Sequence, residues 1–290
     1  MNDLAVVLSQ KKSIYAPMAD AILKTSSILN YDVKFYGDDL SEYKNIIIFD
    51  NCISRINSSL NGENYSNLAW WMNDLRSIDD LRTESIHPAL THIFLCNKEY
   101  LQDYNESFNV PVSYMPQCGH EFYRTNKETE IKNSIIFIGN LTKKQYHYNR
   151  KDIINTLSDL GLWMLSGKKT TYSTNYIYKN TPISLAISLP YQEYTSNRLY
   201  NILASEGFAL TLYYPGIEKQ FTNHEHLVWF KSPEEAKKLA KYYLSHIKER
   251  KKIAKAGHQL YLKKHRMVHR IQNMYDIMNN KTNDFYGYNI

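Results

Sequence analysis

Residues 183–212 read ISLAISLPYQEYTSNRLYNILASEGFALTL, and this stretch decides the fold of the chain. Runs rich in apolar residues occupy 183–189 and 208–212, and a helical pattern occupies 197–205 between them. Apolar runs without regular polar alternation are typical of strands buried on both faces, as in a parallel sheet covered by helices. The stretch is therefore a strand–helix–strand unit, and it predicts an α/β domain.

The same alternation continues on both sides of this unit. The polar segment 121–133 (EFYRTNKETEIKN) lacks apolar periodicity and is expected to be a linker. We predict two α/β domains, at residues 1–125 and 126–290. The remaining expected strands lie at 4–8, 32–36, 45–50, 92–96, 112–115, 134–138, 162–165 and 226–230.

Composition excludes several classes of protein. Of the 290 residues, 43% are hydrophobic and 22% are charged, which excludes a disordered or collagen-like chain. The three cysteines, Cys52, Cys96 and Cys118, are far apart, which excludes a disulfide scaffold or a Cys-rich zinc module. We expect no signal peptide, no membrane partner and a cytoplasmic location, in a bacterium or a phage-infected host.

Positive charge is concentrated near the C-terminus. The net charge is +6, yet residues 231–270 hold 13 Lys and Arg against 3 Asp and Glu. Such a basic stripe can steer a polyanion toward one face of a protein. The alternative is a pair of helices whose lysines simply face water.

Several catalytic motifs are missing from the sequence. No GxGxxG follows the first strand, and neither GxxxxGK[ST] nor GxSxG occurs, which argues against a dinucleotide site, a P-loop and an α/β-hydrolase. Without HExxH or Cys/His ligand spacing we expect no metal site and no cofactor, although a divalent-metal requirement stays open. We interpret His87, His120, His224 and His226 as surface or core residues.

Two strand ends carry the features of an anion site. In open α/β sheets, ligands bind beyond the carboxyl ends of the strands. Glycine allows close backbone approach there, and a following helix N-terminus with basic side chains attracts phosphate, although many such glycines serve only the turn. The candidates after 134–138 and 162–165 are Gly139, Asn140, Lys143, Lys144, Arg150 and Gly167.

A third candidate lies at the start of the 197–205 helix. Ser196 and Asn197 can cap this helix, and Arg198 falls in its first turn. A cation there opposes the helix macrodipole, so an anionic ligand would explain it. The alternative is an ion pair with a nearby acid such as Glu193.

From Arg198 onward the sequence resembles a known family. The pattern continues through 215–221 (PGIEKQF) and 227–230 (LVWF) into the basic helices, with Ile253, Ala254, Gly257 and His265 in register. It is similar to the C-terminal domain of GT-B glycosyltransferases (glycosyl transferase family 1), in particular the spore-maturation CgeB-like ones.

The resemblance implies two Rossmann-like domains that face each other across a cleft. The N-terminal domain would hold the acceptor and the C-terminal domain a nucleotide sugar, with the last helix, within 266–278, crossing back to the first domain. The family glutamate that holds the ribose hydroxyls falls on Asn201, and Glu206 stands where the family usually has glycine. An amide can still bind a diol, but without the charge-assisted strength of a carboxylate.

In the first half, 67–78 (NLAWWMNDLRSI) resembles the Asp-Ile-Arg segment of the T-even phage DNA β-glucosyltransferases, which are also GT-B. This likeness implies Asp74 as the general base of an inverting reaction, with Arg76 beside the acceptor. It also places Arg150 and Arg198 on the donor diphosphate, with Lys143 or Lys144 near another diphosphate-binding position. Alternatively, Asp74 caps a helix or pairs with Arg76.

The expected function is transfer of a sugar from a nucleotide sugar, expected to be UDP-linked, to a hydroxymethylated base in double-stranded phage DNA. The acceptor could instead be a polysaccharide, a glycoprotein or a small molecule. A non-catalytic binding protein on a GT-B scaffold is a further alternative because of Asn201, and an α/β sensor or an epimerase is another.

Overall fold

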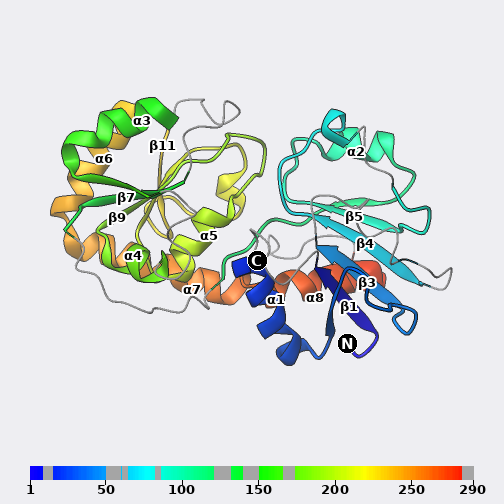
Figure 1. Cartoon of the computed structure of the whole chain (residues 1–290). Helices are drawn as coiled ribbons and strands as arrows, with labels where there is room; N and C mark the ends of the chain where they lie inside the picture. Colours follow the sequence, from blue (N-terminus) through cyan, green and yellow to red (C-terminus); the bar gives the residue numbers. More distant parts are fainter. Residues whose placement is uncertain are drawn as a thin grey trace. The chain divides into compact units, whose positions relative to one another are not determined.

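The computed structural model describes residues 1–8, 16–49, 60, 65–81, 86–120, 132–139, 150–165 and 174–282. The chain divides into two compact units (Figure 1): unit 1 comprises Met1–Gln117 with Met267–Ile290, and unit 2 comprises Cys118–Arg266. The sequence placed the boundary at residues 125 and 126, whereas the contacts place it after Gln117. The reason is that His120 already belongs to unit 2, where Asn201 accepts a hydrogen bond from its backbone N–H (3.1 Å).

Unit 1 contains a six-stranded, fully parallel sheet in the order β2-β1-β3-β4-β5-β6. Helices α1, α2 and α8 complete the unit (Figure 1). Its elements are β1 (Leu4–Leu8), α1 (Ala16–Leu29), β2 (Asp32–Phe35), β3 (Asn45–Phe49), β4 (Asn67–Met72), a 3₁₀ turn (Asp79–Leu81), β5 (His92–Leu95), α2 (Leu101–Ser107), β6 (Val112–Tyr114) and α8 (Met267–Met278).

One strand of this sheet was not predicted. Residues 67–72 are absent from the strands expected from the sequence, but they form β4, between β3 and β5. Trp70 and Trp71 are both fully buried. Trp70 joins the hydrophobic core, and Trp71 donates its indole N–H to the Met115 carbonyl (3.4 Å). Successive side chains of a strand point to opposite faces, so a strand with both tryptophans buried is covered on both sides.

Helix α8 is attached to unit 1 by polar contacts as well as by packing on α1. Arg270 is fully buried and donates to the carbonyls of Pro116 (3.0 Å) and Gln117 (3.0 and 3.1 Å). Tyr275 donates its hydroxyl to Asp3 (3.0 Å). The Arg270 guanidinium thus fixes Pro116 and Gln117, the last residues of the first segment of unit 1, to a helix that follows unit 2 in the sequence.

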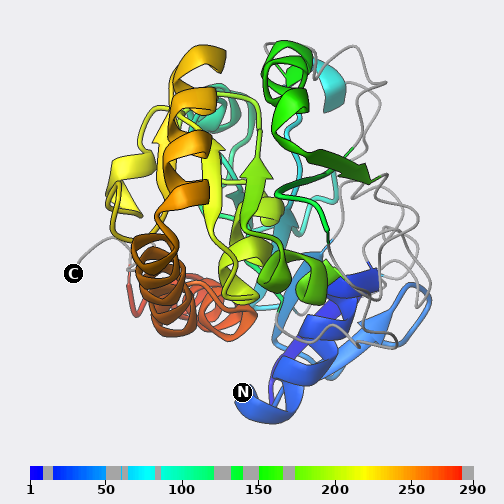
Figure 2. The same cartoon turned by 90° about the vertical axis from the view of Figure 1, so that its left-hand side faces the viewer.

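Unit 2 contains a five-stranded parallel sheet in the order β11-β10-β9-β7-β8. Helix α6 packs on α3, β9 and β11, and it lies in front of the strands in the side view (Figure 2). The elements are β7 (Ile135–Ile138), α3 (Arg150–Leu157), a 3₁₀ turn (Ser158–Leu160), β8 (Leu162–Leu165), α4 (Thr174–Asn180), β9 (Ile183–Ala186), α5 (Asn197–Ala204), β10 (Ala209–Leu212), a 3₁₀ turn (Ile217–Lys219), β11 (Val228–Phe230), α6 (Pro233–Ser245) and α7 (Ile247–Lys264).

The order of these strands locates the expected ligand site. From β7 the chain goes to β8 on one side and then to β9 on the other, so the direction of winding reverses between β7 and β9. In doubly wound sheets, ligands bind outside the carboxyl ends of the strands at this switch point. The ends of β7 and β9 are therefore the place to look in unit 2.

Helix α7 crosses the opposite, amino edge of this sheet. Gly257 allows the crossing, since a Cβ at this position would stand 2.1 Å from the His226 carbonyl oxygen, just before β11. Lysines on the outer face of α7 are exposed, and within the described part of the chain none of them has a carboxylate partner. These lysines are Lys248, Lys251, Lys252, Lys255 and Lys263.

Among the described residues, no helix combines the length and the apolar character needed to cross a bilayer.

We predict that Arg270→Met destabilises the fold. The substitution leaves the Pro116 and Gln117 carbonyls buried without their donor, which should lower the free energy of unfolding by about 2–4 kcal/mol. Urea unfolding measures the change. The control is Lys281→Met, which removes the ion pair that an exposed lysine makes with Asp276 and should change stability by less than about 0.5 kcal/mol. Equal effects of the two substitutions would contradict the role of Arg270.

Candidate functional site

Two arginines meet at the switch point of unit 2. Arg198, in the first turn of α5, donates from Nε to the Ile138 carbonyl (2.8 Å) and from Nη1 to the Ile187 carbonyl (2.9 Å). Arg150, the first residue of α3, donates from Nη2 to the same Ile187 oxygen (2.8 Å). Two positive charges are thus held side by side at the carboxyl ends of β7 and β9. Like charges repel, so this arrangement is suited to an anion.

Residues at the end of β7 contact these arginines and position them. The Arg198 and Arg150 guanidinium carbons lie 4.9 Å and 5.6 Å from the centroid of the Phe137 ring, within the range of a cation–π contact. A Cβ at Gly139 would stand 2.8 Å from both Arg198 Nη2 and the Phe137 ring. A side chain at position 139 would therefore displace Arg198, so the packing of Arg198 explains the glycine at this position.

Both arginines lie at helix N-termini, where the macrodipole already favours negative charge. Ser196 precedes α5 as its N-cap residue, and its hydroxyl accepts a hydrogen bond from the Ser188 hydroxyl (2.6 Å) instead of capping the helix. Two helix ends, two guanidiniums and two hydroxyls therefore share one region at the carboxyl edge of the sheet. Such an arrangement can bind phosphate groups.

The loop before α5 is braced by residues 214–220. Glu193 has a left-handed backbone (φ 49°), its N–H donates to the Pro215 carbonyl (2.8 Å), and its carboxylate pairs with Lys219 (2.5 Å). Thr195 accepts from the Gln220 amide (2.9 Å). The ion pair that the sequence suggested between Glu193 and Arg198 is thus a pair between Glu193 and Lys219, and Arg198 bonds to carbonyls.

Asn201 lies one turn after Arg198 and is buried. Its Oδ1 accepts the His120 backbone N–H, so this amide oxygen fixes the first residues of unit 2 onto α5. His120 is itself buried, and burial lowers the pKa of its imidazole to about 3. The imidazole is therefore neutral at neutral pH. Sequence analysis interprets His120 only as a surface or core residue, and its place beside Asn201 follows from the fold.

Four of the predicted donor-site residues lie outside the described residues: Asn140, Lys143, Lys144 and Gly167. Gly139, Arg150, Ser196, Arg198 and Asn201 are described and lie in unit 2.

Asp74 and Arg76 follow the carboxyl end of β4 in unit 1. Asp74 is half-buried, and its Oδ1 accepts the backbone N–H of the next residue, Leu75 (2.9 Å). Arg76 donates from Nη2 to the Asp80 carbonyl (2.7 Å). The neighbouring strand β5 is followed by Cys96, whose thiol pKa is raised by burial and by the Asp74 charge. The thiol therefore stays protonated at neutral pH.

Buried amides surround this edge of unit 1, and sequence reasoning missed them. Asn73, Asn97 and Gln117 follow β4, β5 and β6 and are at most 4% exposed. Gln117 donates to the Asn73 carbonyl (2.5 Å), and the Asn97 side chain accepts the Tyr100 N–H (3.1 Å). No motif marks these amides, because each belongs to a different strand. Within the described ranges, no three His, Cys, Asp or Glu side chains gather as metal ligands.

Comparison with known proteins shows which family model and which solved structures this chain resembles. Residues 164–276 match the family model described as glycosyl transferase-like. The T4 phage DNA modifying enzyme β-glucosyltransferase superimposes with a TM-score of 0.66 at 11% identity, over 95% of this chain and 98% of that one. The chain has the GT-B fold, and its residues 164–276 are similar to a glycosyl transferase-like domain.

Two other structures support the GT-B assignment. Anabaena Alr3699/HepE in complex with UDP-glucose gives a TM-score of 0.62 at 8% identity, over 96% of this chain and 99% of that one. WaaG, a glycosyltransferase involved in lipopolysaccharide biosynthesis, gives 0.54 at 8% identity, over 95% and 99%. No curated protein sequence matches the chain. The expected fold class is thus confirmed, and Arg150 and Arg198 lie in the nucleotide-sugar half that the resemblance implies.

We predict a pH dependence of stability that comes from His120. Its folded pKa of about 3 lies below the ordinary value of 6.5. Below pH 6.5 the unfolded chain binds a proton that the folded chain excludes, so stability falls with decreasing pH, by up to about 1.4 kcal/mol per pH unit from this group. Urea unfolding at pH 7.5 and pH 5 should show a smaller loss in His120→Gln than in the wild type. Identical losses would refute the buried, neutral imidazole.

Proposed function

We propose that this chain transfers a sugar from a UDP-sugar to an acceptor hydroxyl, with inversion at the anomeric carbon. One observation carries the proposal: Arg150 and Arg198 share the Ile187 carbonyl at the switch point of the glycosyltransferase domain. The UDP-glucose complex of the structurally similar HepE supports a uridine diphosphate donor.

The arginine pair is proposed to stabilise the leaving group of the donor, which is its diphosphate. As the bond between the anomeric carbon and the diphosphate oxygen breaks, negative charge grows on the diphosphate. Fixed guanidiniums and helix N-termini stabilise that charge without reorganising during the reaction. A guanidinium can also bind two phosphate oxygens at once, which fixes the orientation of the diphosphate. In this mechanism, these groups do what a divalent cation does in other phosphate sites.

Asp74 is the proposed general base. Its carboxylate takes the proton of the acceptor hydroxyl, the acceptor oxygen bonds to the anomeric carbon, and UDP leaves from the opposite side with the bonding electrons. The place of Asp74 at the carboxyl end of β4 supports this role, because ligands of α/β sheets bind at that edge. Arg76 lies two residues further on and is proposed to contact the acceptor.

The proposed acceptor is a hydroxymethylated base in double-stranded DNA. The likeness to a DNA modifying β-glucosyltransferase and the Asp74-Leu75-Arg76 segment support this choice. A second acceptor class, a saccharide, is favoured by the position of the α7 lysines. Because α7 crosses the amino edge of the sheet, those lysines lie away from the arginine pair. They therefore do not form a continuous basic surface with it for the phosphates of a DNA backbone.

We predict that Arg198→Lys weakens UDP-sugar binding by about 10- to 100-fold, because an ammonium replaces a guanidinium that can make paired bonds to phosphate. Isothermal titration with UDP-glucose measures the loss, and uridine serves as the control ligand because it has no phosphate. Lys251→Ala, which removes an exposed lysine of α7, should change neither the affinity for UDP-glucose nor the affinity for uridine. Full UDP-glucose affinity in Arg198→Lys would refute the diphosphate site.

We predict that Asp74→Asn lowers kcat by about 10²- to 10⁴-fold while UDP-glucose affinity is unchanged, because only proton transfer is lost. Turnover is followed as UDP release, with a duplex containing 5-hydroxymethyl bases as acceptor and with oligosaccharides in parallel. A salt-sensitive reaction on the duplex supports the DNA acceptor. Turnover with oligosaccharides but not with the duplex would show that the acceptor is a saccharide and not DNA. Undiminished turnover in Asp74→Asn would show that Asp74 is not the general base.

A further inference from the structure

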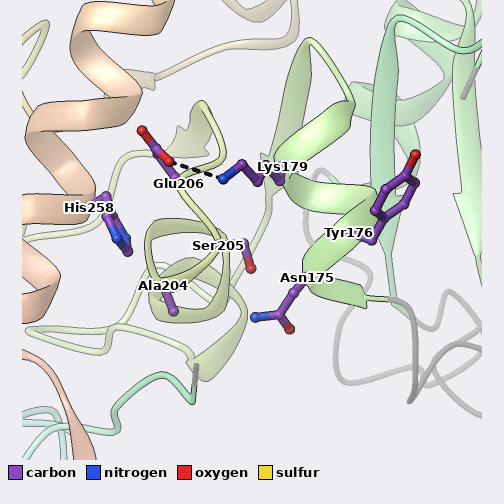
Figure 3. A pocket seen from close by; sticks show the side chains of 7 residues that line it. All are labelled: Asn175, Tyr176, Lys179, Ala204, Ser205, Glu206 and His258. Atoms are coloured by element: carbon purple, nitrogen blue, oxygen red, sulfur yellow. Dashed lines mark hydrogen bonds and ion pairs between the residues drawn. The ribbon is translucent and has the colours of Figure 1, made fainter. Parts of the chain in front are cut away.

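We propose that a pocket at the amino edge of the unit 2 sheet binds one sugar ring of a glycan, separately from the donor site. The pocket has a volume of about 250 Å³ and lies between α4, the end of α5 and α7 (Figure 3). Sites for drug-sized ligands usually enclose about 300–1,000 Å³, so this pocket suits a smaller ligand. It is lined by Asn175, Tyr176, Lys179, Ala204, Ser205, Glu206 and His258.

The pocket and the arginine pair lie at opposite ends of one helix. Helix α5 begins next to the carboxyl end of β9 and ends at Ala204, before β10 starts at Ala209. Its 8 residues correspond to a length of about 12 Å. A ligand beside Ser205 and Glu206 therefore leaves the diphosphate region at Arg198 accessible.

Glu206 is the residue that most needs an explanation. It has a left-handed backbone (φ 57°) and closes α5, with its own N–H on the Leu203 carbonyl (3.1 Å) and the Gly207 N–H on the Ile202 carbonyl (2.9 Å). This C-terminal motif normally takes glycine, because a side chain is strained there. Its negative charge also lies at the helix end where the macrodipole favours a cation. A carboxylate kept against both preferences points to a ligand that it binds.

The pocket offers both hydrogen-bond donors and acceptors. Glu206 pairs with Lys179 (3.3 Å), so together they add no net charge. His258 donates from Nδ1 to the Leu203 carbonyl (2.9 Å), because a carbonyl can only accept, and its Nε2 is left to face a ligand. In Figure 3, Asn175 and Lys179 reach from α4 toward Ser205 and Glu206, with His258 on the far side.

This chemistry selects a sugar over other small ligands. An anion would meet the Glu206 carboxylate and a cation the Lys179 ammonium, so a neutral ligand fits best. Each sugar hydroxyl both donates and accepts, which matches the mixed lining, and the Ala204 methyl can contact the C–H face of the ring. A saccharide is the second acceptor class under the proposed function, so the inference rests on that function for the origin of its ligand.

The test uses the full chain and saturation-transfer NMR with glucose, N-acetylglucosamine and maltose as probes. We expect binding of at least one probe at millimolar concentration, which UDP does not displace. Glu206→Gly should weaken that binding at least 10-fold while the Tm stays equal or rises, because glycine relieves the left-handed backbone. Loss of binding in this variant is therefore not a loss of folding.

Asn280→Gly is the matched control. Asn280 closes α8 with the same pair of hydrogen bonds and a left-handed backbone (φ 55°), but it belongs to unit 1. Its variant should keep full sugar binding, and so should Arg198→Lys. The inference is overturned if no probe binds, if binding survives in Glu206→Gly, or if UDP displaces the probe. Failure of UDP binding itself would count against the donor site and not against this pocket.

Discussion

The Ile187 carbonyl oxygen is the point on which the candidate donor site depends. It accepts hydrogen bonds from Arg150 and Arg198, which come from helices after different strands, and so brings two positive charges together at the reversal of strand order. Placing two cations side by side is unfavourable in itself. The surrounding structure maintains it through the Ile138 carbonyl, the Phe137 ring and the close backbone at Gly139.

Helix α5 combines two local conflicts, one at each end. Arg198 places a positive charge at the N-terminus and Glu206 a negative charge at the C-terminus, the reverse of what the helix macrodipole favours. The buried apolar face of the helix, which includes Leu199, Ile202 and Leu203, stabilises it regardless of these charges. Residues that oppose local preference on a well-packed element are typical of functional positions, and both ends of α5 carry one.

Much of the fold could be predicted because its strands are short apolar runs with clear boundaries. The missing strand was β4, whose aromatic residues resemble a buried segment of either kind until its pairing with β3 and β5 is known. The unit boundary was also displaced, because His120 lies just before the polar segment 121–133 and its backbone N–H bonds to Asn201 in unit 2. Neither feature has a local sequence signal.

The sequence by itself determined the α/β class, the glycosyltransferase resemblance and the presence of Arg150, Arg198 and Asp74 after strand-like runs. These follow from local patterns, since burial on both faces and helix starts are encoded within a few neighbouring residues. Only the tertiary structure decided that Arg150 and Arg198 share one carbonyl, that Glu193 pairs with Lys219, and that Glu206 lines a pocket with His258. Such contacts join residues far apart in the chain, and packing of the sheet brings them together.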